Sequence, residues 1–205
     1  MTPATMSTFF ALLSLACWAG TGGTLVLVAL RRWRPGSGAA AMADAVGASA
    51  LGLACLVATV TMAGSLYYSL VAHYVPCELC WYQRICLYPL GAVLAVAAFR
   101  RDTRVWVYVL PPAVVGAVIA AYHTQLQAYP TQRSFCSSFN PCTARWVWKF
   151  GFVSLPFMAL AAFCFVITMV LVAGNSRPPA DDEDLDQPAS TTPEVSRSRE
   201  VQPTR

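Results

Sequence analysis

Charged residues are scarce in this sequence. They make up only 12% of the 205 residues, whereas 57% are hydrophobic, and the mean hydropathy is +0.52. Because a soluble domain carries about 25% charged residues, this composition excludes an ordinary soluble protein and predicts a membrane protein. Residues 1–8 carry no charged side chain, so the basic segment that opens a signal peptide is missing. The first apolar stretch is therefore predicted to be retained as a helix.

Several familiar motifs are also missing. The sequence has no glycine-rich phosphate loop, no Ser/His/Asp spacing typical of a hydrolase and no internal repeat. Its basic residues lie in short clusters between apolar stretches, so we expect no nucleic-acid partner. Seven of the ten acidic residues follow Asn175, in a segment rich in Pro, Ser and Thr that has almost nothing to bury. Residues 176–205 are therefore predicted to be a disordered acidic tail.

Five uncharged stretches predict an all-α membrane protein with five spans, at residues 9–30, 45–76, 85–99, 105–132 and 150–176. A span needs about 20 residues, and the third stretch has only fifteen. A helix that starts near Cys77 would supply the missing length and reach about 34 Å at about 1.5 Å per residue. Such a helix places Arg84 two turns inside it.

Arginine clusters set the expected orientation. They follow the first span, at 31–34, and the third span, at 100–104, and the positive-inside rule places both linkers in the cytoplasm. Segments 74–81 and 123–149 are then extracytoplasmic. Three basic residues in the second segment reduce the difference in positive charge between the two sides of the membrane. The N-terminus is expected outside and the C-terminal tail inside.

The eight cysteines fall into two classes. Four lie inside apolar spans, where a thiol behaves as a small hydrophobe and packing is the expected role: Cys17, Cys55, Cys86 and Cys164. The other four map to the predicted outer face, where disulfides persist: Cys77, Cys80, Cys136 and Cys142. This clustering on one side indicates a redox site.

Cys77 and Cys80 form a C-x-x-C at the predicted start of a helix, directly after Pro76. Unpaired N–H groups and the helix dipole there favour an anion, which lowers a thiol pKa and makes a thiolate available. Arg84 follows Cys80 by four residues and so shares its helix face. A guanidinium at the edge of the hydrocarbon is costly and indicates function or pairing, with snorkelling to the interface as the alternative.

Five residues lie between Cys136 and Cys142, and they include an Asn-Pro that favours a turn. A small disulfide ring is feasible there, and a structural staple of the loop is one reading of it. The second reading is a redox pair, because a C-x-x-C lies in the same exterior space and two neighbouring dithiols can exchange disulfides.

The stretches PCELCWYQRICLYPL and CSSFNPCTARWVWKFGFVSLPFMAL resemble the DsbB/BdbC disulfide bond formation proteins, especially the Gram-positive branch. The resemblance runs from about residue 64 to about residue 165. It implies a four-helix transmembrane core at residues 45–175, in the bacterial cytoplasmic membrane. Residues 1–44, an extra transmembrane helix and basic linker, lie outside that core.

The resemblance also implies an enzyme, a quinone-dependent thiol oxidoreductase that reoxidises a thioredoxin-like partner of the DsbA/BdbD type. Cys136 and Cys142 would meet the partner, and Cys77 and Cys80 would lie next to the quinone, held or polarised by Arg84. In the relay implied, the partner attacks Cys136, Cys142 leaves and attacks Cys77, and Cys80 becomes the electron donor. Thirteen arginines against one lysine indicate a high-GC genome, which with the Gram-positive resemblance favours menaquinone over ubiquinone.

Two rival interpretations remain. Four outer thiols could form a zinc centre, but a cation one turn away at Arg84 repels a divalent ion, and we expect no metal. A reductant relay running outward would need cysteines at the cytoplasmic span ends, and the sequence has none there. His73 and His123 lie near outer span ends and are expected to pack at the interface with a polar tip, with a place near the quinone as an alternative for His123.

The orientation can be tested with topology reporters. Fusions after Arg34 or Arg104 should report a cytoplasmic location, and a fusion near Gln132 should report an exterior one, because of the two arginine clusters. A cytoplasmic signal at Gln132 would contradict the redox interpretation, since it would put Cys136 and Cys142 in a reducing compartment.

Overall fold

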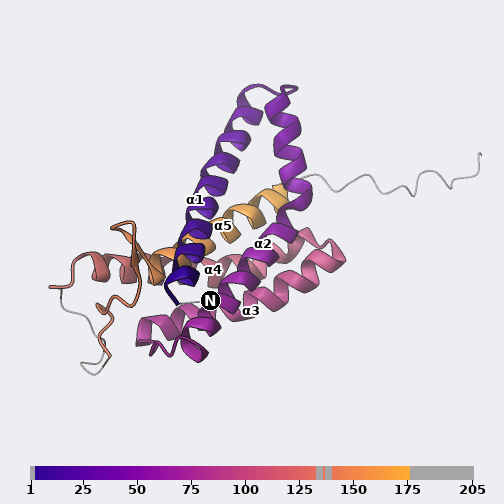
Figure 1. The fold of residues 1–205 in the computed structure, drawn as a ribbon. Helices are drawn as coiled ribbons and strands as arrows, with labels where there is room; N and C mark the ends of the chain where they lie inside the picture. Colours follow the sequence, from indigo (N-terminus) through magenta and orange to yellow (C-terminus); the bar gives the residue numbers. More distant parts are fainter. Residues whose placement is uncertain (1–2, 133–135, 137–139, 176–205) are drawn as a thin grey trace, which may run out of the picture.

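The computed structural model describes residues 3–132, 136 and 140–175. Five helices dominate it (Figure 1): α1 (Pro3–Trp33), α2 (Gly38–Leu70), α3 (Glu78–Arg100), α4 (Trp106–Ala128) and α5 (Leu155–Asn175). Each is long and apolar enough to cross a membrane, which confirms the predicted all-α membrane protein. The predicted disordered tail, residues 176–205, lies outside the described residues.

The start of α3 agrees with the prediction from span length. Cys77 is its N-cap, with extended backbone, and the carbonyl oxygen of Cys77 accepts the first helical bond from the Trp81 N–H at 3.1 Å. The helix ends at Arg100, followed by Arg101 in the left-handed conformation. The short 3₁₀ turn Thr103–Val105 then leads into α4.

Helix α5 lies at the centre of the bundle, in contact with α1, α2 and α4. Its close approach to α4 depends on Gly116, where an added Cβ would lie 2.3 Å from the Phe163 ring. Small residues at helix contacts are the usual means of close packing in a membrane, where lipid is as apolar as the side chains. Helices α1 and α2 form a long hairpin that widens away from its closed end (Figure 1).

The segment between α4 and α5 contains a two-stranded antiparallel sheet, which the sequence did not predict. Strand β1 (Trp148–Lys149) pairs with β2 (Val153–Ser154). The turn between them requires positive φ at Phe150 and Gly151, 53° and 80°, and glycine adopts that conformation readily.

Arg145 anchors this segment to the end of α4. Its Nε donates to the carbonyl oxygen of Gln127 at 2.7 Å, and Nη2 contacts the carbonyls of Gln127 and Ala128. A helix leaves its last carbonyls without partners, and a cation there also complements the negative end of the helix dipole. This local role explains a basic residue in a segment that the arginine pattern predicted to be extracytoplasmic.

Candidate active site

Two cysteines stand at the beginning of α3, where the helix makes its first turn. Cys77 is 6% exposed, and its Sγ lies 2.9 Å from the Sγ of Cys80 in a hydrogen bond between the two sulfur atoms. The extended Cys77 backbone, held after Pro76, lets its side chain fold back toward the residue three positions later. Both thiols therefore lie at the positive end of the helix.

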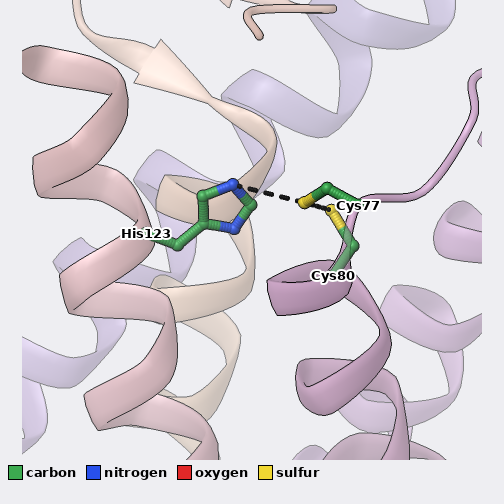
Figure 2. A group of neighbouring side chains, drawn as sticks. All are labelled: Cys77, Cys80 and His123. Carbon is green, nitrogen blue, oxygen red and sulfur yellow. Dashed lines mark hydrogen bonds between the residues drawn. The ribbon is translucent and has the colours of Figure 1, made fainter. Parts of the chain in front are cut away.

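His123 reaches this pair from α4, as Figure 2 shows. Its imidazole is 1% exposed, and Nε2 lies 3.7 Å from Cys77 Sγ and 3.0 Å from the carbonyl oxygen of Cys142. A carbonyl oxygen only accepts hydrogen bonds, so Nε2 carries a proton in this contact. The sequence interpretation expected an interfacial histidine with a polar tip, whereas this side chain is fully buried between the two cysteine pairs.

Gln83 orients the other side of the imidazole. Its Nε2 donates to His123 Nδ1 at 3.0 Å, and the glutamine is 7% exposed. An imidazole that donates through Nε2 and accepts at Nδ1 is the neutral tautomer. Sequence reasoning missed Gln83, although its position one turn after Leu79 on the inner face of α3 could have indicated a buried polar residue.

The second pair of cysteines forms a disulfide. Cys136 and Cys142 are bonded, with 5.9 Å between their Cα atoms. Cys142 is 0% exposed and packs with Cys77 and Leu126, whereas Cys136 is partly buried at the edge of the same cluster. Asn140 ties the two loops together, since its Nδ2 donates to the Pro76 carbonyl at 2.8 Å. The two cysteine pairs predicted from the sequence thus lie side by side at one end of the bundle.

The surroundings of Cys77 lower its pKa to about 4. The hydrogen bond from the Cys80 thiol is the largest cause, burial acts against it, and the hydrogen bond from His123 adds to the lowering. At neutral pH Cys77 is therefore a thiolate. Since a thiolate is the nucleophile and the better leaving group, this sulfur is prepared for disulfide exchange.

Arg84 lies one turn below Cys80, but it has partners that the sequence did not reveal. Its Nε donates to Ser65 Oγ at 2.9 Å and its Nη2 to the Ser65 carbonyl at 3.0 Å, and Nη2 also contacts Ser69 Oγ. The guanidinium lies 5.3 Å from the centre of the Trp81 ring. Nη1 has no hydrogen-bond partner among the described residues, so part of the charged group is left to meet a ligand.

An apolar cavity of about 330 Å³ opens beside these residues. Cys80, Gln83, Arg84 and His123 take part in its lining, which otherwise consists mostly of apolar side chains together with several serine and threonine hydroxyl groups. Ligand sites generally combine such an apolar wall with a few convergent polar groups. The arrangement places thiol, imidazole and guanidinium groups around one space.

Cys77, Cys80 and His123 also meet the basic requirement for a metal site. One ligand atom from each lies within 4.8 Å of the others, and two thiolates with an imidazole are a known zinc donor set. The set uses the sulfur atoms of the pair that the sequence predicts to be redox-active, so metal analysis of the purified protein separates the two interpretations.

The four remaining cysteines lie within helices. Cys17 is 8% exposed, and Cys55 and Cys86 pack at the margin of the main core. Cys164 is partly exposed on α5. None of these four is bonded to another described residue in a disulfide. Cys17 additionally lines the cavity, a position that the expectation of simple packing did not include.

Comparison with known proteins identifies similar sequences. The model of the family "Disulfide bond formation protein DsbB" matches residues 47–173. Disulfide bond formation protein C of Bacillus subtilis is 46% identical over 123 residues, which cover 58% of this chain and 89% of the relative. A probable disulfide formation protein of Oceanobacillus iheyensis is 41% identical over 118 residues, covering 56% and 81%. One from Coxiella burnetii is 39% identical over 123 residues, covering 58% and 84%. No solved structure matches the chain significantly.

The pKa of Cys77 leads to a testable pH dependence. In the reduced protein the thiolate should persist as the pH falls and disappear only near pH 4, because a lowered pKa keeps the charged form down to that pH. An ordinary thiol loses its charge near pH 8.5. The thiolate's ultraviolet absorbance measures the midpoint, and His123→Ala should move it upward by removing one hydrogen bond. A midpoint above pH 8 in the parent protein would contradict this prediction.

Proposed function

The chain belongs to the DsbB family of disulfide bond formation proteins, and from this membership we propose that it reoxidises an extracytoplasmic thioredoxin-like dithiol oxidase and passes the electrons to a membrane quinone. Family and fold make it a multi-pass membrane oxidoreductase of disulfide bond formation. The partner, the electron acceptor and the sidedness of the loops belong to the proposal.

One observation carries the proposal: both cysteine pairs meet around a single buried imidazole. Cys142 and Cys77 pack in one cluster, and His123 contacts the carbonyl of the first and the sulfur of the second. A disulfide can exchange with a neighbouring thiolate only through direct sulfur attack. Two pairs used only as structural staples would have no need to share a buried contact.

The first exchange takes place at the loop disulfide. Cys136 is the partly exposed sulfur and Cys142 the buried one, so a partner thiolate attacks Cys136. The Cys136–Cys142 bond breaks, a partner–Cys136 bond forms, and Cys142 leaves as a thiolate. The second thiol of the partner then attacks the partner sulfur that is bonded to Cys136. This forms a disulfide in the partner and releases Cys136 as a thiolate.

The second exchange moves the electrons to α3. The Cys142 thiolate attacks Cys77 of the Cys77–Cys80 disulfide, a Cys142–Cys77 bond forms, and Cys80 leaves as a thiolate one helical turn from the Arg84 guanidinium. Cys136 then attacks Cys142, which restores the loop disulfide and leaves Cys77 and Cys80 reduced. A bonded loop pair and an unbonded helix pair, as this last step would leave them, are compatible with the described cysteines.

The cavity fits a quinone as the final acceptor. Its lining is mostly apolar but includes the Cys80 sulfur and Arg84, whose Nη1 has no hydrogen-bond partner in the part of the chain that the structure describes. Arg84 would hold a carbonyl oxygen and offset negative charge there, an electrostatic effect that a low dielectric strengthens. A bound quinone supplies a two-electron acceptor. Menaquinone is our proposal for the species, on the weaker basis of arginine usage.

We propose the same three-part organisation that the sequence predicted. Residues 45–175 form the redox core, a division that the family match over residues 47–173 supports. Residues 1–44 add a helix and a basic linker, and residues 176–205 form an acidic cytoplasmic tail. In this scheme the redox loops face the exterior of the bacterial cytoplasmic membrane.

Single cysteine substitutions test the relay. Changing Cys77, Cys80, Cys136 or Cys142 to Ser should abolish reoxidation of a reduced thioredoxin-like partner in membranes, because each sulfur takes part in an exchange step. The matched controls Cys55→Ala, Cys86→Ala and Cys164→Ala should retain activity, since these free thiols lie within helices and outside the cluster that holds the two cysteine pairs. Full activity in any variant of the first group would exclude that sulfur from the relay.

Arg84 is tested by two replacements. Arg84→Gln should raise the quinone KM or lower turnover by about a hundredfold, the lower end of the effect of removing one preorganised donor. Arg84→Lys should not restore the parent kinetics, because a point charge does not replace a planar fork aimed at a carbonyl. The measurement is quinone reduction in proteoliposomes with a reduced donor.

Exchange at Cys136 provides the folding control for both Arg84 variants. It should proceed normally, because Arg84 does not contact the loop disulfide. If Arg84→Lys behaves like the parent, the arginine serves as an anchor between α3 and α2. Parent kinetics in both variants would remove Arg84 from the quinone site.

A further inference from the structure

Helix α1 takes part in the cavity, although it lies outside the family match of residues 47–173. Its contribution comes from one helical face. Phe10, Leu13, Ser14 and Cys17 line the cavity, and their spacing of three and four residues places them on the same side of the helix. The cavity therefore has a wall that the matched part of the chain does not supply.

This wall covers the space between α2 and α5. Helix α1 contacts both of these helices. On the α2 side, the Phe10 ring packs directly against Gly64, where an added Cβ would lie only 2.9 Å from the ring. On the α5 side, a Cβ on Gly20 would lie 2.9 Å from the Phe165 ring. Both contacts are close, so α1 packs as an integral part of the bundle.

The outer end of α1 is joined to the redox loops by an aromatic row. Phe10 lies against Tyr68, with 5.9 Å between ring centres, and Tyr68 donates a hydrogen bond to Ser7 Oγ at 3.2 Å. Tyr68 stacks on Tyr74 at 5.6 Å, and Tyr74 stacks on Trp146 at 5.1 Å. All four rings line the cavity, so α1 is connected to the two segments that carry the cysteines.

We propose that α1 forms the specificity wall of the quinone cavity, with Phe10, Leu13 and Cys17 setting the size of the ring system that fits against Arg84 and Cys80. This inference rests on the proposed function, because it takes a quinone as the occupant. The Arg84 guanidinium and the Cys80 thiol in this mostly apolar lining favour that occupant over a lipid acyl chain, which has no polar group to meet them. A cavity of about 330 Å³ is near the lower end of about 300–1,000 Å³ for ligand sites, so one side chain on the wall is a large fraction of the space.

Adjacent leucines on α1 give a matched test. Leu13 lines the cavity, and Leu12 is 55% exposed on the outside of the same helix. Leu13→Trp should weaken binding of a decyl-tailed naphthoquinone at least about tenfold, because added volume in a packed site is poorly tolerated. Leu12→Trp should change binding by less than about twofold, as expected for a substitution facing away from the site. The dissociation constant is measured by quenching of tryptophan fluorescence, corrected for the added tryptophan through Leu12→Trp.

A second variant covers the case in which Leu13→Trp does not fold, as judged by thiol exchange at Cys136. Leu13→Ala removes volume and should reduce the preference for the naphthoquinone over a decyl-tailed benzoquinone, because the larger cavity holds neither ring closely. Equal selectivity in Leu13→Ala and the parent would overturn the specificity wall. Equal losses in Leu12→Trp and Leu13→Trp would also overturn it.

The same titrations distinguish failure of this inference from failure of the proposed function. A parent protein that binds neither quinone contradicts the electron acceptor itself. A parent protein that binds a quinone, with all α1 variants binding it equally well, contradicts only the role of α1.

Discussion

The contact on which the cysteine-bearing end of the bundle depends is the one between His123 and its three neighbours. One imidazole, 1% exposed, holds a carbonyl from the α4–α5 segment, a sulfur from the start of α3 and an amide from the next turn of α3. A buried polar group without partners costs free energy. Removing any one of these groups would therefore take a hydrogen-bond partner from the imidazole and destabilise the contact. The imidazole thereby couples the positions of the two cysteine pairs, which belong to segments far apart in the sequence.

Around this contact, small residues and polar residues have different roles in the bundle. Small residues allow α4 and α5 to approach closely, as at Gly116, and build a rigid apolar scaffold. Polar groups are concentrated at one end, where Arg145 satisfies the last carbonyls of α4 and Asn140 joins the two loops. The scaffold can therefore hold a thiolate, an imidazole and a guanidinium close together without placing them in the middle of the hydrocarbon.

Much of this arrangement could be predicted from the sequence, because span lengths and cysteine positions are local signals. The shortage of apolar residues after Arg84 was enough to place the start of α3 near Cys77. The partners of Arg84 could not be predicted, since Ser65 and Ser69 lie on a different helix and serines are common in membrane spans. The contact between His123 and Gln83 could not be predicted for the same reason. It depends on how α3 and α4 pack, and no local sequence pattern indicates the distance between the two side chains.

The unequal exposure of the loop disulfide has a consequence for its chemistry with other thiols. Cys142 is 0% exposed, while Cys136 is partly accessible. A small external thiol can therefore become attached only to Cys136, and the displaced Cys142 sulfur stays within the protein, close to the mixed disulfide that it has just left. Reclosure of the ring is then intramolecular and competes with a second external thiol, which must arrive by diffusion. In the proposed relay, a partner that carries two thiols would escape this competition because its second thiol would also be held in place, so the loop would select for dithiol proteins without a pocket that recognises them.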